Sequence, residues 1–263
     1  MTSNPAGSDA RPWTRREVIA SGFVALLPPL WGCSDDPTAP ETEGASPFMT
    51  VTWREPALDP AIGEQALGLS TGRDGLLYVP SSYDPVVPIP LFVALHGAGG
   101  RADNWRGFHD ACDTRGMALL AIDARDVTWD RIRGSFGPDV AFLDRAMGHV
   151  FDRVHVDPER IVLGGFSDGA SYALSLGPAN GNLFSRIIAF SAGFSRPPEG
   201  RVGRPGIFVS HGTRDAILPV RNARDTIVPT FRSEGYDVEY VEFDGGHEVP
   251  REISGQALDW FLG

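Results

Sequence analysis

Lysine is absent from the sequence, and all 23 basic residues are arginines. A chain without lysine cannot use a phosphate-loop lysine, a Schiff-base lysine or a Ser-Lys catalytic pair. Basic residues are also outnumbered, because 34 aspartates and glutamates bring the formal net charge to -11. Such an acidic chain repels a phosphate backbone, so we expect no nucleic acid partner.

Cysteine is equally scarce, since the chain holds only Cys33 and Cys112. Cys112 lies in a predicted helix and is interpreted as a small buried hydrophobic residue. No HExxH sequence and no paired metal-ligand spacing occur, so we expect neither a metal site nor a cofactor. The chain does have 42% hydrophobic and 22% charged residues, which is an ordinary balance for one globular domain with a sizeable core.

The first 32 residues are interpreted as a twin-arginine, lipoprotein-type signal peptide. Residues 14–19 spell TRREVI, and the apolar stretch that follows is too short to span a bilayer. The stretch ends in LWGC, which is similar to a bacterial lipoprotein cleavage site with Cys33 as the acylated residue. We therefore expect an exported lipoprotein of the bacterial cell envelope, periplasmic or surface-facing. The alternative is a disordered leader with an incidental cysteine.

The next segment, residues 33–47, is acidic and rich in Pro, Thr and Ser, so we expect a flexible tether. With Cys33 lipidated, membrane association depends on that N-terminal anchor only, and no intramolecular disulfide can form. The remaining residues, 48–263, are expected to fold as one domain.

Strand-like and helix-like runs alternate through this domain, which indicates an α/β fold with a mostly parallel central sheet flanked by helices. Strands are predicted at Met49–Trp53, Leu76–Val79, Pro90–Leu95, Ala118–Ile122, Arg160–Leu163, Arg186–Phe190, Gly206–Ser210 and Val238–Phe243. Helices are predicted at Ala102–Arg115, Asp139–Val154, Ser167–Leu176, Val220–Ser233 and Glu252–Leu262.

Polar groups follow four of the predicted strands at the point where each strand ends. The four segments are HGAGG from His96, GGFSDGA around Ser167, HGTRD ending at Asp215 and DGGHEVP around His247. Because the carboxyl ends of parallel strands meet at one edge of a sheet, we expect these groups to lie together.

The Gly165-x-Ser167-x-Gly169 spacing predicts a tight turn between strand and helix. Side chains next to such a turn would clash, so both flanking positions favour glycine, and the helix start favours a developing anion at the serine. The alternative is a glycine-rich turn with a serine that only caps the helix. Serine, acid and histidine also follow one another in the order of a hydrolase triad, and only His247 comes after Asp215.

From about Gly72 to Gly263 the chain resembles an α/β-hydrolase of the phospholipase/carboxylesterase and polyhydroxybutyrate-depolymerase-like group. The resemblance rests on LHGAGG, GFSDGASYALSLG, SHGTRDAILP and FDGGHEVP. It implies a catalytic domain that cleaves carboxylic esters through an acyl-enzyme intermediate, with Ser167 as nucleophile, Asp215 as acid and His247 as base. It also implies oxyanion donors at the backbone N–H groups of Asp168 and Ala98. His96 is expected to order the HGAGG loop rather than to ionise.

The substrate is expected to be a small-molecule or lipid-like ester at an open site. No large cap domain is expected, because the connection from Phe190 to Gly206 is short. The long connection from Asp123 to Asp139 should overhang the site, with Trp129 and Phe136 as candidate pocket walls. Simple packing is the alternative for Trp129. A peptidase or acyltransferase on the same triad, and a non-catalytic envelope lipoprotein that binds a ligand, remain alternative functions.

Overall fold

The computed structural model describes residues 46–263. The expected signal peptide, Cys33 and nearly all of the expected tether lie outside the described residues. Those residues form an eight-stranded sheet in the order β1-β2-β4-β3-β5-β6-β7-β8. The pairs from β4 to β8 are all parallel, and only β1 with β2 and β2 with β4 are antiparallel. The prediction of a mostly parallel central sheet flanked by helices is confirmed.

The elements that make up the fold have the following bounds. The strands are β1 (Gly63–Ala66), β2 (Gly75–Val79), β3 (Ile89–Leu95), β4 (Ala118–Ile122), β5 (Val156–Phe166), β6 (Arg186–Phe190), β7 (Gly206–Gly212) and β8 (Val238–Phe243). The α-helices are α2 (His109–Arg115), α3 (Asp130–Arg133), α4 (Pro138–Phe151), α5 (Asp168–Leu176), α6 (Val228–Ser233) and α7 (Arg251–Leu262). Short 3₁₀ turns occupy Ala102–Phe108 (η1) and Gly177–Asn180 (η2), and a π turn occupies Asn222–Ile227 (η3).

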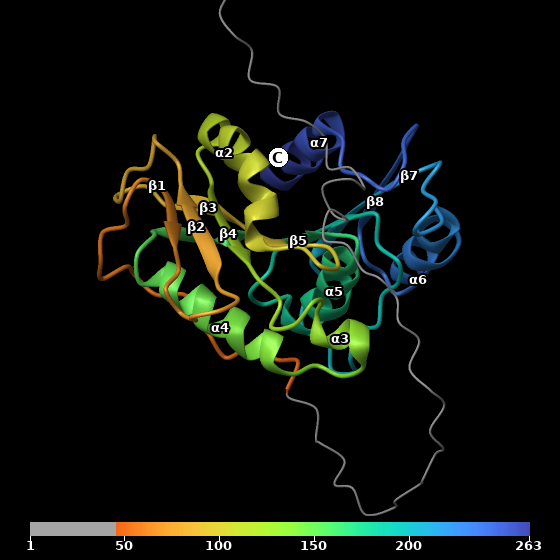
Figure 1. Cartoon of the computed structure of the whole chain (residues 1–263), viewed down its shortest axis with the longest axis horizontal. Helices are drawn as coiled ribbons and strands as arrows, with labels where there is room; N and C mark the ends of the chain where they lie inside the picture. Colours follow the sequence, from red (N-terminus) through yellow and green to blue (C-terminus); the bar gives the residue numbers. More distant parts are fainter. Residues whose placement is uncertain (1–45) are drawn as a thin grey trace, which may run out of the picture.

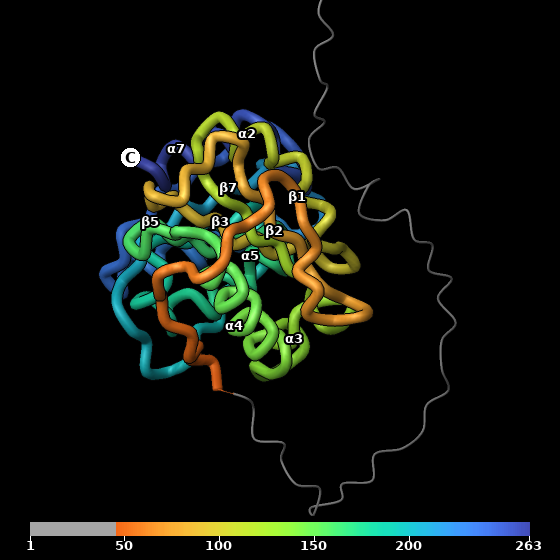
Figure 2. The backbone as a smooth tube through the Cα atoms, turned by 90° about the vertical axis from the view of Figure 1, so that its left-hand side faces the viewer, coloured from red at the N-terminus to blue at the C-terminus, as the bar shows by residue number. Residues whose placement is uncertain are grey.

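Helices cover both faces of the sheet (Figure 1). Helices α2 and α7 lie on one side, and α3, α4 and α5 lie on the other; Figure 2 shows the same layers from the β1 edge. Every residue of β3 and β4 is buried, as expected for central parallel strands covered on both faces. Successive β3 side chains therefore alternate between the two cores, so that Val93 packs with α4 and α5 while Phe92 packs with η1 and α7.

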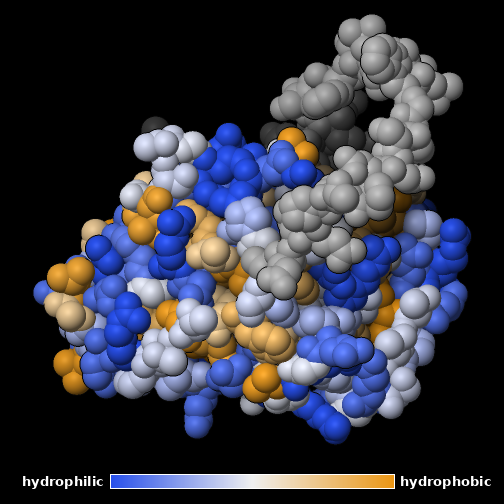
Figure 3. Space-filling model, turned by 90° about the horizontal axis from the view of Figure 1, so that it is seen from below, coloured by the Kyte–Doolittle hydropathy of each residue, from blue (hydrophilic) through white to orange (hydrophobic). Residues whose placement is uncertain are grey.

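The surface formed by α3 and α4 mixes hydrophilic and hydrophobic residues (Figure 3). No helix among residues 46–263 has the length and hydropathy needed to cross a membrane.

The predicted strand Met49–Trp53 is not a strand. Its backbone N–H groups bond to side chains instead: Thr50 and Val51 both donate to Asp144 Oδ1 at 2.8 Å. The segment is therefore tied to α4 and contributes no sheet edge, because a carboxylate takes the place of a neighbouring strand.

Two predicted helices begin differently from the expectation. The segment predicted at Ala102–Arg115 begins as η1 and continues as α2, and the segment predicted at Val220–Ser233 begins with the π turn of η3 before α6. The connection between β6 and β7 contains neither helix nor strand, and no cap domain is present among the described residues. Without a cap in this part of the chain, we expect the edge of the sheet beyond β5 to be open.

Candidate active site

Ser167 occupies the turn between β5 and α5 with φ 58° and ψ -116°. This left-handed conformation is strained for a residue with a Cβ, and such strain concentrates at functional sites. The flanking glycines permit the turn, since a Cβ on Gly165 would lie 2.4 Å from the Gly169 carbonyl carbon. A Cβ on Gly169 would lie 2.1 Å from the Leu95 carbonyl oxygen, so α5 starts in direct contact with the end of β3.

Three elements bring Ser167, His247 and Asp215 into one hydrogen-bonded chain. His247 Nε2 lies 2.9 Å from Ser167 Oγ, and His247 Nδ1 lies 2.6 Å from Asp215 Oδ2. Because a carboxylate only accepts, the ring proton sits on Nδ1, which leaves Nε2 to accept the serine proton. Ser167 and Asp215 are buried, each with 8% of its surface exposed, and the His247 side chain is 10% exposed.

Asp215 is fixed from several directions. Its Oδ1 accepts the backbone N–H groups of Ile217 and Leu218, each at 2.9 Å. Its Oδ2 also lies 3.3 Å from Nε2 of a second histidine, His211, which is fully buried on β7. Burial alone would raise the pKa of Asp215, but the hydrogen bonds from His211, His247 and Leu218 outweigh it and hold the pKa well below its usual range.

The HGAGG loop lies directly against the serine. A Cβ on Gly97 would be 3.3 Å from Ser167 Cβ, and the next residue, Ala98, is exposed at the tip of the loop. The N–H groups of Gly99 and Gly100 are engaged with Val127 O at 2.7 Å and with Gly97 O at 3.0 Å. On the other side of the serine, Asp168 is the first residue of α5, where a backbone N–H has no partner within the helix.

His96 is buried beneath this loop and serves as a fixed hydrogen-bonding group. Its Nδ1 lies 2.7 Å from Gly97 O, and its Nε2 accepts the Ala124 N–H at 2.9 Å. This pairing fixes the neutral Nδ1–H tautomer. Burial lowers the pKa of His96 to about 4, so the ring is uncharged at neutral pH. The expectation that His96 orders the loop rather than ionises agrees with this geometry.

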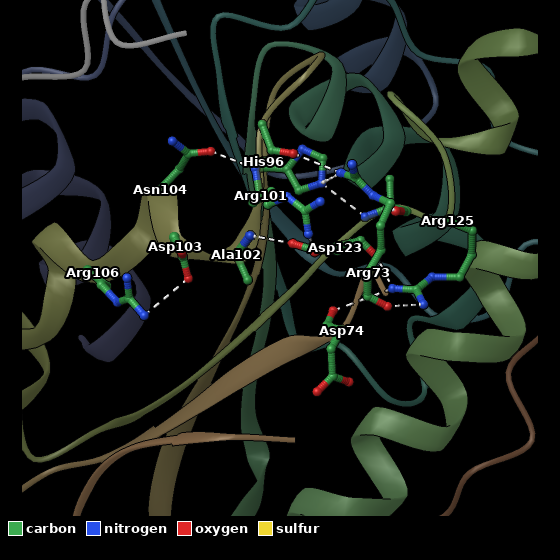
Figure 4. Close-up of polar contacts among 12 residues, drawn as sticks. Arg73, Asp74, His96, Arg101, Ala102, Asp103, Asn104, Arg106, Asp123 and Arg125 are labelled. Carbon is green, nitrogen blue, oxygen red and sulfur yellow. Dashed lines mark hydrogen bonds and ion pairs between the residues drawn. The ribbon is translucent and has the colours of Figure 1, made fainter. Parts of the chain in front are cut away.

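An arginine network surrounds the loop from the side of β2 (Figure 4). Arg73 donates to Gly100 O at 2.8 Å and to Ala124 O, and its Nη2 lies 3.3 Å from His96 Nε2. Arg125 in turn donates to Arg73 O at 2.5 Å. The loop is thus held by guanidinium groups that no sequence motif indicated.

A buried carboxylate anchors the far end of the same loop. Asp123 accepts from Arg101 Nη1 at 2.9 Å and from the Ala102 N–H at 2.7 Å (Figure 4). The Arg101 N–H is taken by Asn104 Oδ1 at 2.7 Å. Asp123 follows β4 directly, as polar site residues often do, but its partners could not be read from the chain.

The pocket-wall interpretation of Trp129 is wrong. Trp129 has no exposed surface and donates its Nε1–H to His96 O at 2.8 Å, so it supports the HGAGG loop from inside. Phe136 is 6% exposed and packs edge-on against Tyr172. The connection does approach the site, but these two aromatics face the core because the segment folds inward onto α5.

Asp139 closes the connection at its other end. Its carboxylate accepts the N–H groups of Arg125 at 2.5 Å and Asp130 at 2.7 Å. Burial raises the pKa of Asp139 to about 6. Asp139 lies in the first turn of α4, as expected, and its side chain ties the loop to that turn. Among residues 46–263 no group of three or more His, Cys, Asp or Glu side chains is placed to hold a metal ion.

Comparisons with known proteins identify related sequences and folds. Residues 141–259, just under half of the chain, match the model of the family described as Phospholipase/Carboxylesterase. Feruloyl esterase C of Emericella nidulans is 26% identical over 213 residues, which cover 67% of this chain and 77% of that protein.

Solved structures share the fold. The thermophilic esterase of the planctomycete Thermogutta terrifontis, with propionate bound, has a TM-score of 0.59 at 20% identity and covers 77% of this chain and 94% of its own. The Bacillus cereus carboxylesterase has a TM-score of 0.55 at 18% identity and covers 73% and 94%. The sheet order and these matches define an α/β-hydrolase. Within that class the family model and the feruloyl esterase relative support a carboxylesterase-type hydrolase.

Proposed function

We propose that the enzyme hydrolyses carboxylic esters by nucleophilic attack of Ser167. The single observation that carries the proposal is the continuous hydrogen-bonded chain from Ser167 Oγ through the His247 ring to Asp215. In the first step His247 Nε2 takes the serine proton while Oγ bonds to the acyl carbon. The imidazolium then gives this proton to the alcohol oxygen as the bond between that oxygen and the acyl carbon breaks. The alcohol departs, and the acyl group stays bonded to Ser167 Oγ as an acyl-enzyme.

Water completes the cycle in the second step. His247 takes a proton from water, the resulting hydroxide attacks the acyl carbon, and the proton returns to Ser167 Oγ as the acid departs. Asp215 keeps the Nδ1–H tautomer and stabilises the imidazolium in both steps. The backbone N–H groups of Ala98 and Asp168 are the proposed oxyanion donors, and removal of one such donor typically costs about 3–4 kcal/mol.

The open edge of the sheet favours esters with an accessible acyl group on a bulky alcohol or acid. The aliphatic side chains of Val127 and Ile217 are 58% and 44% exposed, and their backbones contact the HGAGG loop and Asp215 respectively. An apolar rim of this kind suits small-molecule or lipid-like esters. Since a relative is named a feruloyl esterase, hydroxycinnamate esters belong in the first substrate panel.

A serine-to-alanine exchange tests the assignment. Ser167→Ala should abolish turnover of short p-nitrophenyl esters and labelling by a fluorophosphonate probe, with the thermal midpoint retained. Ser254→Ala, at a half-buried serine on α7 whose hydroxyl bonds to the Arg251 carbonyl one turn away, is the matched control and should behave as the wild type. Undiminished turnover in Ser167→Ala would refute the proposal. Amide and thioester substrates beside the oxyesters would identify a peptidase or thioester acyl transfer, and a wild type that neither turns over nor labels would indicate a binding protein.

We also propose that the protein is exported to the cell envelope and anchored by a lipid on Cys33. The support is the sequence of residues 14–33 alone. Mass spectrometry of protein from the producing cell should find a mature N-terminus at Cys33 with added diacylglyceryl mass. An unmodified chain beginning at Met1 would contradict the anchor without affecting the proposed chemistry.

A further inference from the structure

A threonine links the two sides of the candidate oxyanion hole. Thr128, in the connection between β4 and α3, donates its hydroxyl proton to Asp168 Oδ2 at 2.6 Å. Asp168 is the first residue of α5, and its backbone N–H is one of the two proposed oxyanion donors. The hydrogen bond therefore restrains Asp168, which carries a proposed oxyanion donor, through a residue 40 positions away in the sequence.

The residues adjoining Thr128 hold the other side of the hole. The Val127 carbonyl accepts the Gly99 N–H at 2.7 Å, and Trp129 Nε1 donates to His96 O at 2.8 Å. Three consecutive residues, 127 to 129, thus contact the HGAGG loop twice and the start of α5 once. This short segment therefore contacts both elements that carry the proposed oxyanion donors.

We infer that Thr128 is a positioning residue for the oxyanion hole, which it completes by joining α5 to the segment that holds the HGAGG loop. The inference rests on the proposed function and adds a residue to its machinery. Oxyanion donors act by being fixed before charge develops, and a misplacement of about 1 Å can cost about 100-fold in rate. Thr128 touches no reacting atom in this scheme and acts through Asp168.

The hydroxyl also controls a nearby negative charge. The Asp168 carboxylate belongs to the same residue as a proposed oxyanion donor, and a negative charge that turned toward the developing oxyanion would repel it. A hydrogen bond to Thr128 holds the carboxylate in one rotamer. Without it, the carboxylate can turn toward the same N–H groups that the oxyanion needs.

The test compares two substitutions of similar size. Thr128→Val removes the hydroxyl and keeps the shape, whereas Thr128→Ser keeps the hydroxyl. We expect kcat per active site to fall about 10- to 100-fold in Thr128→Val with KM little changed, and to stay within about 3-fold of wild type in Thr128→Ser. Active sites are counted by the fraction of molecules that a fluorophosphonate labels at completion, so that misfolded protein does not enter the rate.

A transition-state analogue gives a readout that general destabilisation would not move. A trifluoromethyl ketone forms a tetrahedral adduct with an oxyanion, so its affinity should fall in Thr128→Val by the same factor as kcat/KM. Equal kcat in Thr128→Val and wild type, or an equal loss in Thr128→Ser and Thr128→Val, would overturn the inference. Failure of the wild type to turn over esters would instead contradict the proposed function.

A double-mutant cycle covers the case in which one variant is poorly folded. Asp168→Ala removes the acceptor of the same hydrogen bond, so Thr128→Val should have no further effect on kcat in that background. The cycle isolates the bond even if the carboxylate has an effect of its own. Additive losses in the double variant would show that Thr128 acts in some other way and would refute the inference.

Discussion

His211 is the buried partner of Asp215, the proposed catalytic acid, and the structure sets the size of the effect expected when His211 is replaced. His211 Nε2 lies 2.6 Å from Leu218 O and 3.3 Å from Asp215 Oδ2. Since a carbonyl oxygen only accepts, the proton must lie on Nε2 and is shared with the carboxylate. One N–H therefore fixes both the turn after β7 and the acid within it.

His211→Leu removes this donor and keeps an apolar side chain in the space. The Leu218 carbonyl loses its partner and a buried carboxylate loses a charge-assisted hydrogen bond, so we expect the free energy of unfolding at pH 7 to fall by about 1–3 kcal/mol. His211→Gln, whose amide nitrogen reaches a similar position, should recover part of this loss. The kcat value should also fall, because Asp215 then holds the His247 ring less firmly.

The pH dependence of the loss identifies its cause. In the folded protein the pKa of Asp215 is held low, so this group contributes stability above the unfolded pKa of about 3.9, and that contribution is lost as pH falls through the folded pKa. The stability difference between wild type and His211→Leu should thus be full near pH 7 and narrow below about pH 4. Urea titrations at several pH values measure it. A variant as stable as wild type, or a difference that stays constant into acid, would refute the reasoning.

Two further predictions follow from close contacts and burial near the site. Gly169→Ala should abolish turnover and lower the thermal midpoint, because its Cβ would meet the Leu95 carbonyl oxygen at 2.1 Å and push α5 away from β3; an active, stable variant would contradict this. The second prediction concerns Asp139, whose pKa is raised to about 6 by burial. Its protonated form stabilises the folded protein fully below about pH 3.8, and this stabilisation is lost as the pH rises through about 6. Relative to Asp139→Asn, wild type should lose about 2 kcal/mol between pH 4.5 and 7.5 in urea titrations, and parallel pH profiles would disprove it.

The position of the candidate site could be predicted from the sequence because it depends on backbone geometry. Parallel strands end at one edge, so motifs placed directly after β3, β5, β7 and β8 must converge there whatever lies between them. The turn at Ser167 could also be predicted from the sequence, since a Cβ on Gly165 or Gly169 would collide with backbone atoms. Strand and helix bounds in this central part of the chain differ from the expectation by only a few residues, apart from the longer β5.

The supporting side chains could not be predicted, because the direction of a side chain is not visible in the sequence. Arg73 meets Gly100 across 27 positions, and Thr128 meets Asp168 across 40. The sequence left pocket wall and packing both open for Trp129 for the same reason, since a tryptophan in a long connection can face a pocket or the core, and the structure shows packing. Met49–Trp53 is a strand-like run in the sequence, but the Asp144 carboxylate bonds to the N–H groups that a strand would have used.

The supporting side chains of His211, Trp129 and Thr128 explain how a site without a lid can still be preorganised. Each part of the proposed site accepts a hydrogen bond from a supporting side chain. Asp215 accepts from His211, the HGAGG loop from Trp129, and the first residue of α5 from Thr128. The Trp129 N–H and the Thr128 hydroxyl are neutral donors, so they act as fixed dipoles. Because rigidity comes from buried partners rather than from a closing lid, the upper edge of the sheet can stay uncovered. On the proposed function, we expect such a site to take large esters without a conformational step. Its rate should respond more to substitutions below the sheet edge than to changes in the exposed loop after β6.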